Sequence, residues 1–426
     1  MTWPERAAAD WLTVEDARRR ALALVAPLPP EEVPLHAAPG RALAEPIRAA
    51  ATLPPWDNSA MDGYAVHGTE IAGATPDAPI ALTVVGEARA GTRWEGVLRS
   101  GQALRIMTGG PLPDGADTVV RVEDTDREQT SGRVWIHSDR DLGRNVRPGG
   151  QDMRAGELLL EAGDRLGAGK LAVAAAAGLA MVTVHRRPRV AVLTSGEELR
   201  APDAFEDVRA GRGIPDTNGP MLHAAATELG AESLALGPVP DRVDLVRARL
   251  EDASQSEADL LVTVGGASMG RTDLFQEVLR AMGAALDFWR VRIRPGSPFF
   301  AGTIPRAGRA PLPVLGLPGN PVSAFVTFHL FVRPALLTLA GHRHVDLPAL
   351  TARAGAPLAG GGGLTHFLRV RLESDRGEMV AHPTGLQGSG LVRGLATADA
   401  LAIVPPGTER IQEGERASVL LLRLPS

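Results

Sequence analysis

Short apolar runs rich in β-branched residues alternate with amphipathic segments between residues 187 and 340. An apolar run of this length predicts a buried strand, and an amphipathic segment predicts a helix that keeps one polar face in water. The alternation indicates a mostly parallel sheet with helices on both faces. The predicted strands are Arg189–Thr194, Ser233–Leu236, Leu260–Val264, Leu286–Ile293, Phe299–Ile304 and Val314–Leu317, and the predicted helices are Asn218–Gly230, Asp241–Ala253 and Asp273–Met282. We expect Asn218 to cap the first of these helices and Gly230 to lie just past its end.

A long apolar helix is predicted to follow from Asn320. Asn320 stands at its N-cap and Pro321 at the first helical position, where the missing N–H has no intrahelical partner to lose. Pro334 predicts a kink, because proline removes one backbone hydrogen bond from a helix interior.

The flanking parts of the chain are rich in strands. Residues 78–138 carry four strand-like runs separated by Gly, Pro and Asp turns, which predict a separate small β domain. The residues after His342 predict a small β-barrel or sandwich. Helical patterns at Thr13–Leu24 and Ala168–Ala177 lie on either side of the β domain, and we expect them to pack together with that domain inserted between them.

Polar segments follow the predicted strands of the α/β region. Each one alone is typical of a turn or a helix cap. Ligands of such sheets bind at the carboxyl ends of the strands, and carboxylates with glycine turns at that edge suit a phosphate ligand bridged by Mg²⁺. The segments are Thr194–Leu199, Asp216–Gly219, Asp241, Gly265–Asp273 and Leu317–Pro321.

The fourth of these segments contains Gly265, Gly266 and Gly270 between a strand and a helix. A strand, a glycine turn and a helix present backbone N–H groups to an anion. Asp273 either caps the helix, with Gln276 as reciprocal partner, or holds a metal over a bound phosphate. The residues alone leave both roles open.

Two further polar loops occur in the first third of the chain. The loop Leu53–Val66 carries Asp57 and Asp62, and the turn after Thr108 leaves backbone N–H groups free for an anion. In the α/β region, period two places Arg290, Arg292 and Arg294 on one strand face; they form either a solvated face or an anion site.

Composition narrows the possible chemistry. The chain of 426 residues has a formal net charge of −5, which argues against nucleic-acid binding, and its length predicts several domains. The absence of Cys excludes disulfides, thiolate nucleophiles and Cys-bound metal sites. The N-terminus lacks a signal-peptide pattern, and the apolar run 171–184 is too short to span a bilayer, so we expect a cytoplasmic protein without a membrane partner. The residues predict a Mg²⁺-dependent enzyme acting on a phosphorylated or nucleotide-linked ligand.

Six ordered motifs resemble the molybdopterin molybdenumtransferases, a family that includes the gephyrin E domain. The resemblance implies insertion of molybdate, a co-substrate, into adenylylated molybdopterin with release of AMP, using Mg²⁺ as cofactor. It also implies a doubly wound molybdopterin-binding α/β domain (187–340), an inserted β domain (51–145), a discontinuous N-terminal linker domain (1–50 and 146–186) and a C-terminal β-barrel (341–426). The motifs are Asp57–Val66, Arg105–Pro113, Thr194–Leu199, Asp216–Asn218, Gly265–Gly270 and Leu317–Ser323.

The resemblance implies a homodimer whose site is shared between the α/β domain of one subunit and the inserted domain of the other. The catalytic residues would be Asp62, Thr108, Glu198 and Asp273, and the metal ligands Glu198, Asp241 and Asp273. The remaining substrate-binding residues would be Asp152, Asp241, Gly265, Gly266, Ser268, Arg290, Arg294, Pro318, Asn320, Pro321, Arg369 and Ser389.

The sequence departs from the family at three positions where members commonly carry lysine. Arg290 and Arg294 keep the positive charge, whereas Ser297 removes it. Two alternatives stand beside the main hypothesis: the related molybdopterin adenylyltransferase, which uses ATP and is also a candidate protein partner, and a gephyrin-like scaffold.

Overall fold

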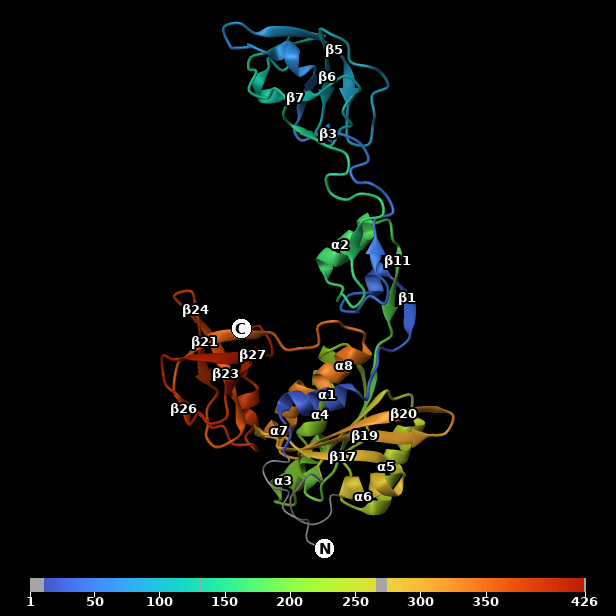
Figure 1. Cartoon of the computed structure of the whole chain (residues 1–426), viewed down its shortest axis with the longest axis vertical. Helices are drawn as coiled ribbons and strands as arrows, with labels where there is room; N and C mark the ends of the chain where they lie inside the picture. The colour runs from blue at the N-terminus through green and yellow to red at the C-terminus, as the bar shows by residue number, and fades with distance from the viewer. Residues whose placement is uncertain (1–10, 130–131, 266–273, 425–426) are drawn as a thin grey trace. The chain divides into compact units, whose positions relative to one another are not determined.

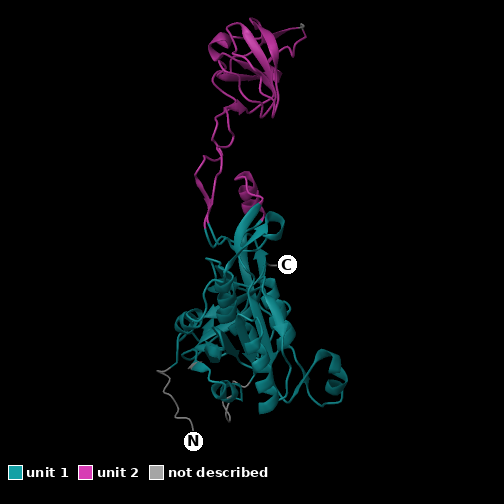
Figure 2. Cartoon of the chain, turned by 90° about the vertical axis from the view of Figure 1, so that its right-hand side faces the viewer, with its two compact units in different colours: residues 1–45, 162–167, 181–426 teal, residues 46–161, 168–180 magenta. Residues whose placement is uncertain are grey.

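The computed structural model describes residues 11–129, 132–265 and 274–424. The chain divides into two compact units (Figure 2). The first unit comprises residues 1–45, 162–167 and 181–426, and the second comprises residues 46–161 and 168–180. The division into four domains stays a prediction.

The second unit contains a five-stranded sheet in the order β7-β4-β6-β5-β8 (Figure 1). Tyr64 and Val66 of β4 pack into one hydrophobic core, and Ala65 packs into another. This is expected, because successive side chains of a strand point to opposite faces of the sheet. The strand-rich character predicted for residues 78–138 is therefore confirmed. The strands are β4 (Gly63–Val66), β5 (Ile80–Ala88), β6 (Gln102–Ile106), β7 (Thr118–Arg121) and β8 (Arg133–Ile136).

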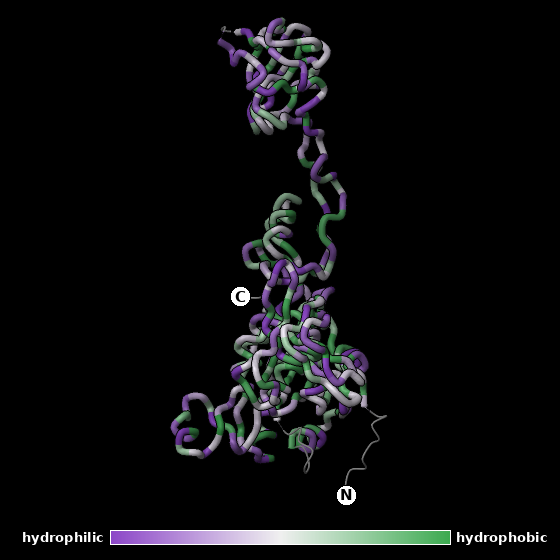
Figure 3. The backbone as a smooth tube through the Cα atoms, turned by 90° about the vertical axis from the view of Figure 1, so that its left-hand side faces the viewer, coloured by the Kyte–Doolittle hydropathy of each residue, from purple (hydrophilic) through white to green (hydrophobic). Residues whose placement is uncertain are grey.

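Smaller elements complete the second unit. Two short antiparallel pairs join β2 to β10 and β3 to β9, and α2 is a nine-residue Ala-rich helix. Figure 3 shows the apolar character of this helix along the tube. The elements are β2 (Ile47–Arg48), β3 (Asn58–Ser59), η3 (Gly68–Ile71), η4 (Val122–Asp124), β9 (Val146–Arg147), β10 (Leu158–Leu160) and α2 (Ala168–Ala176).

A six-stranded sheet in the order β15-β12-β16-β20-β19-β17 lies at the centre of the first unit. The first four strands are parallel, and β19 runs antiparallel to both of its neighbours. The mostly parallel sheet predicted from the sequence is confirmed. The strands are β12 (Arg189–Thr194), β15 (Glu232–Ala235), β16 (Leu260–Val264), β17 (Ala285–Arg290), β19 (Pro298–Arg306) and β20 (Arg309–Leu317).

Helices cover both faces of this sheet. Val190 and Val192 of β12 pack into one core with α4 and the helical segment after residue 320, whereas Ala191 and Leu193 pack into the other core with α5 and α6. This three-layer arrangement explains why the central strands are apolar on both faces. The helices are α4 (Asn218–Glu228), α5 (Val243–Gln255), α6 (Leu274–Ala281), α7 (Pro321–Thr327), the π-helical turn η6 (Phe328–Val332) and α8 (Arg333–Leu339).

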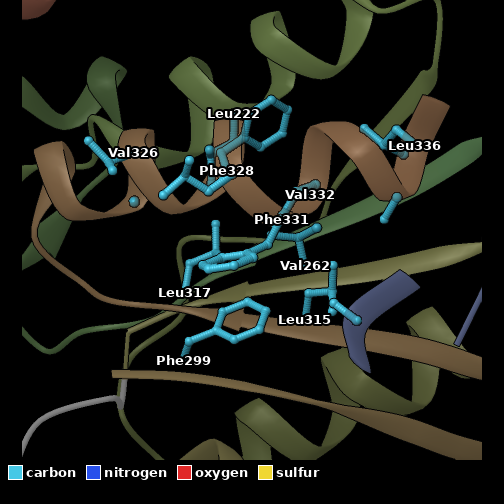
Figure 4. Close-up of a cluster of buried hydrophobic side chains, with 14 of the residues drawn as sticks. Leu222, Val262, Phe299, Leu315, Leu317, Val326, Phe328, Phe331, Val332 and Leu336 are labelled. Atoms are coloured by element: carbon cyan, nitrogen blue, oxygen red, sulfur yellow. The ribbon is translucent and has the colours of Figure 1, made fainter. Parts of the chain in front are cut away.

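The apolar segment from Pro321 to Leu339 is interrupted by a π-helical turn before Pro334, and the kink predicted at this proline stays a prediction. Its π-helical turn precedes the proline, and Phe331 of this turn stacks on Phe299 of the sheet with ring centroids 4.4 Å apart (Figure 4). Among the described helices, this is the one stretch long and apolar enough to cross a membrane, and 78% of that window is buried inside the protein. Its apolar surface is therefore accounted for by the core.

The N-terminal helix α1 (Val14–Leu22) belongs to the same core. Thr13 caps it by accepting a hydrogen bond from the Asp16 N–H at 3.0 Å, and Ala17 and Ala21 pack into the α/β core. The predicted packing of this helix with residues 168–177 stays a prediction, because α2 belongs to the other unit.

The predicted strand Leu286–Ile293 is also wrong in extent. The segment forms two strands in different sheets, because β17 ends at Arg290 and β18 (Ile293–Arg294) pairs with β23 of the C-terminal region. Val291, between them, donates its N–H to Ser297 O at 2.9 Å, which turns the chain.

The C-terminal region is a closed barrel. Its strands follow the order β23-β24-β21-β27-β25, and β25 pairs again with β23, which closes the ring. Of the two predicted alternatives, a barrel and a sandwich, the structure shows the barrel. Its strands are β21 (Ala349–Ala354), β23 (Thr365–Asp375), β24 (Glu378–Pro383), β25 (Ala400–Val404) and β27 (Arg416–Leu421).

The remaining elements of the first unit are short. Strand β1 pairs with β11, β13 with β14, and β22 with β26. Their bounds are β1 (Pro30–Pro34), η2 (Leu35–Ala37), β11 (Met181–His185), β13 (Leu199–Arg200), η5 (Pro202–Ala204), α3 (Phe205–Arg209), β14 (Ile214–Pro215), β22 (Leu358–Ala359), β26 (Arg410–Ile411) and η7 (Val392–Leu395).

Candidate functional site

Three parallel strands end side by side at one edge of the α/β sheet. Thr194 at the end of β12 is in register with Val264 of β16, and Val264 is in register with Leu317 of β20. The polar segments that follow these strands therefore start from one edge, as predicted. The core beneath the edge is apolar and includes Val262, Leu317 and, on helix α4, Leu222 (Figure 4).

Asp216 organises the turn that enters helix α4. Its Oδ2 accepts a hydrogen bond from the Thr194 hydroxyl at 2.8 Å, and its Oδ1 accepts from the backbone N–H groups of Asn218 and Gly219 at 3.0 and 3.1 Å. Asp216 is only 3% exposed. The prediction that Asn218 caps this helix is wrong, because Asn218 is its first residue and the carboxylate of Asp216 supplies the cap.

Four residues are neighbours at the strand ends, and we call them the strand-end floor: Ser195, Asn218, Gly265 and Gly319. The Asn218 Nδ2 donates to Gly319 O at 2.8 Å, and a Cβ added at Gly319 would lie 3.6 Å from the Gly265 Cα. Gly265 has a φ of +115°, and a Cβ there would lie 2.5 Å from Ser195 O. Only glycine fits this close approach of two backbones.

The loop that follows β20 carries three predicted binding residues. Pro318 is buried, whereas Asn320 is exposed and occupies the N-cap position of α7 without using its side chain in a capping bond. Pro321 is the first residue of α7, as predicted. The Asn320 amide is therefore not committed to the helix.

The predicted metal ligands Glu198 and Asp241 are both exposed. Glu198 follows β12, and its carboxylate folds back beside Gly196, where an added Cβ would lie 2.9 Å from Oε2. Asp241 lies two residues before α5, which starts at Val243 rather than at Asp241 as predicted. The third ligand, Asp273, and the binding residues Gly266 and Ser268 lie outside the described residues.

No cluster of three or more His, Cys, Asp or Glu side chains suited to a metal occurs within residues 11–129, 132–265 and 274–424. This donor set still fits Mg²⁺, because Mg²⁺ is commonly held by one or two carboxylates together with substrate phosphates and water. Exposed hard oxygen donors at Glu198 and Asp241 meet that requirement.

The three arginines at the end of β17 and directly after it differ in exposure. Arg294 is exposed, whereas Arg290 and Arg292 are half-buried, and Val291 and Ile293 are fully buried between them. The predicted alternation of faces thus holds, although the strand is broken. The Arg290 guanidinium carbon lies 5.6 Å from the centre of the Trp11 ring, within the range of a cation–π contact.

Ser297 has its hydroxyl committed to the protein. It donates to Ile293 O at 2.6 Å and so closes the turn after β18. The serine at the position where the resemblance led us to expect lysine thus makes a local structural bond.

Arg369 lies inside the barrel and is 1% exposed. Its Nη2 donates to Leu386 O at 2.7 Å, its Nη1 approaches Gly388 O at 3.5 Å, and its buried Nε has no hydrogen-bond partner. Burial lowers the pKa of this guanidinium. The loop it holds continues to Ser389, whose carbonyl accepts a 3.0 Å hydrogen bond from the Val322 N–H of α7. Arg369 therefore connects the barrel with the start of α7 through this loop.

Asp62 and Thr108 form a clasp in the second unit. Asp62 Oδ1 accepts hydrogen bonds from the Thr108 N–H at 2.7 Å and from its hydroxyl at 2.8 Å. These two hydrogen bonds lower the pKa of the Asp62 carboxyl, and the bond from the Thr108 backbone N–H has the larger effect. The two polar loops identified in the sequence thus meet each other. Asp152 lies apart in the chain, is exposed, and donates its N–H to Leu53 O.

Sequence reasoning assigned no role to Ser195 and gave Asn218 only the role of a helix cap. Ser195 Oγ and Asn218 Oδ1 are buried polar atoms without a hydrogen-bond partner. Their position next to a strand end was visible in the sequence, but their burial depends on the neighbouring glycine turns and became visible only in the structure.

Three family descriptions match the chain in order. Residues 12–178 match the MoeA N-terminal region (domains I and II), residues 191–338 a probable molybdopterin binding domain, and residues 351–422 the MoeA C-terminal region (domain IV). A molybdopterin molybdenumtransferase from Nostoc sp. is 36% identical over 93% of this chain and 89% of its own length. The chain belongs to the molybdopterin molybdenumtransferase family.

Other members of the molybdopterin molybdenumtransferase family agree in sequence and in fold. The Bacillus subtilis enzyme is 34% identical over 97% of this chain and 94% of its own length. The crystal structure of the molybdopterin biosynthesis moeA protein from Pyrococcus horikoshii OT3 superposes with a TM-score of 0.82 at 27% identity, covering 96% of this chain and all of that one. The strand-end floor lies within the probable molybdopterin binding domain of the family.

Proposed function

We propose that this protein inserts molybdate into the dithiolene of adenylylated molybdopterin and releases AMP and molybdenum-bound molybdopterin. The observation that carries the proposal is the strand-end floor, where two unpartnered buried polar atoms and two close-packed glycines lie within the region matching a molybdopterin binding domain. Membership of the molybdopterin molybdenumtransferase family supports the same transferase activity in molybdenum cofactor biosynthesis.

In this proposal the protein mainly positions its substrates. The sulfur atoms that receive molybdenum belong to the substrate, which agrees with a chain that has no Cys. Molybdate is an oxyanion, so the exposed guanidinium of Arg294 offers it a positive charge and bidentate donors. Holding molybdate beside the dithiolene turns a bimolecular encounter into a positioned reaction.

Glu198, Asp241 and Asp273 would hold Mg²⁺. When bound, the ion would neutralise negative charge on the phosphate groups of the substrate and of the leaving AMP. The exposure of the first two carboxylates supports this role, because a ligand that shares the ion with phosphate has to be reachable from solution.

We further propose a cytoplasmic homodimer. Helix α2 supports the dimer, because it is Ala-rich and buries only Ala174 within the subunit. A partner subunit would bring its Asp62–Thr108 clasp to the strand-end floor. The same proposal assigns substrate binding to Asp152 and Ser389. It also includes the molybdopterin adenylyltransferase as a protein partner.

The proposal is tested by measuring AMP release from adenylylated molybdopterin with and without molybdate and Mg²⁺. We expect release that requires both ions and no consumption of ATP. Asp241→Asn should lose most of the Mg²⁺-dependent rate, whereas Asp244→Asn, a matched exposed carboxylate paired with Arg242, should keep it. ATP consumption with molybdopterin would instead identify an adenylyltransferase, and absence of both reactions would favour a scaffold.

A further inference from the structure

The strand-end floor contains two side-chain atoms that no group in the protein satisfies. Ser195 Oγ and Asn218 Oδ1 are both buried without a hydrogen-bond partner, and their residues are 7% and 5% exposed. The identity of the amide atom follows from chemistry, because Gly319 O can only accept and so must face the amide nitrogen. Buried polar atoms are nearly always paired, so these two require an explanation.

The chemistry of the amide oxygen limits what can bind there. Oδ1 of Asn218 can only accept a hydrogen bond. Phosphate and molybdate present acceptor oxygens at neutral pH, so they would repel it. The matching ligand atom has to be an N–H or O–H donor. The Ser195 hydroxyl can donate or accept, so it can pair with either kind of neighbouring atom.

Two glycines lie beside these atoms. Gly265 and Gly319 leave no side chain over the floor, and a Cβ at Gly265 would come within 3.3 Å of Ser195 Oγ. A nitrogen heterocycle with an amino group next to a ring nitrogen offers a donor and a second polar atom in one plane.

We propose that Ser195 and Asn218 bind the amino-bearing edge of a nitrogen heterocycle of the substrate, whereas its oxyanion groups are bound elsewhere. This inference rests on the proposed function, because adenylylated molybdopterin contains two such edges, in the pterin and in the adenine. The two sources share the same recognition chemistry and are separated by the choice of probe.

The test uses the full-length protein and measures binding of molybdopterin, AMP and molybdate separately. Ser195→Ala should weaken binding of one heterocyclic probe roughly fivefold, the effect of one hydrogen bond, and leave molybdate binding unchanged. Resistance to unfolding should not fall, because the variant removes a buried hydroxyl that has no partner. Asn218→Ala should weaken the same probe.

Thr263→Val is the matched control. The Thr263 hydroxyl is also buried and unpartnered in the same sheet, but it lies within β16 and not on the floor. This variant should bind all three probes as the wild type does. Loss of the heterocyclic probe limited to the floor variants supports the inference.

Unchanged binding of both heterocycles by Ser195→Ala and Asn218→Ala would overturn the inference, and so would an equal loss of molybdate binding. The first result is expected if the two atoms hold only a buried water molecule. Molybdate-dependent AMP release by the wild type is measured in parallel. If the wild type releases AMP but the floor variants bind both heterocycles normally, this inference alone is refuted. If the wild type binds a heterocycle through the floor but releases no AMP, only the proposed transferase activity is refuted.

Discussion

Replacing Asp216 with Ala should loosen the start of helix α4. The change removes the acceptor of two backbone N–H groups at the helix start, which is worth about 1 kcal/mol. It also leaves the Thr194 hydroxyl, 1% exposed, without its partner, which costs about 1–3 kcal/mol. We therefore expect a local loss of about 2–4 kcal/mol.

Hydrogen exchange of the backbone amides of Asn218–Glu228 measures this loss locally, which matters because a chain of several domains need not unfold in one step. A loss of about 2 kcal/mol corresponds to exchange roughly 30-fold faster than in the wild type. Asp216→Asn is the matched control. It retains an acceptor oxygen and should lose only about 1 kcal/mol, since neutral hydrogen bonds are weaker than charge-assisted ones.

A double-mutant cycle with Thr194→Val separates the two contributions. In the Thr194→Val background, Asp216→Ala should cost only the capping part, about 1 kcal/mol. An Asp216→Ala protein whose α4 amides exchange at the wild-type rate would refute the role given to this carboxylate. Equal costs in both backgrounds would refute the contribution of the Thr194 hydroxyl.

Three further predictions concern other parts of the protein. The pKa of the Asp62 carboxyl is lowered, so the stabilisation from its clasp with Thr108 should be complete above roughly pH 4 and should disappear as the pH falls through the lowered pKa. An NMR titration of this carboxyl with a midpoint at or above the ordinary pKa would contradict this prediction. Arg369→Ala should make proteolytic cleavage within residues 385–391 roughly tenfold faster, because the loop carbonyls lose their buried donor; unchanged cleavage would contradict it. Burial lowers the pKa of His329 to about 3, whereas the unfolded chain takes up the proton near 6.5, so this residue should lower the free energy of unfolding by roughly 2 kcal/mol between pH 7 and pH 5. Burial also lowers the pKa of His342, to about 4, so urea unfolding of His329→Leu should still show a fall, smaller than in the wild type by that amount; an equal pH slope in both proteins would be the contrary result.

Much of the fold was predictable because its strands are buried on both faces. The strand Arg189–Thr194 was predicted with the bounds that the structure has, and the helix near Asn218 was predicted to within one residue of its start. Local patterns of this kind depend on nearby residues alone. The break after Arg290 was not predictable, because the second piece of the segment pairs with strand β23, more than 70 residues further along the chain.

The candidate site was predictable as an edge but not as a set of contacts. The polar segments after β12, β16 and β20 follow directly from the register of parallel strands. The capping role of Asp216 could be recognised only once the start of helix α4 was known. The unpartnered Asn218 Oδ1 could be recognised only from the contact of the Asn218 amide with Gly319, which is 101 residues away in sequence. The burial of Arg369 depended on closure of the barrel, which no local pattern encodes.

The most direct test of the account is a crystal structure of the protein with adenylylated molybdopterin or its product AMP bound. The account predicts that the ligand lies at the carboxyl ends of β12, β16 and β20, in contact with Ser195 or Asn218. A ligand found only on the C-terminal barrel, or on the opposite edge of the α/β sheet, would contradict it.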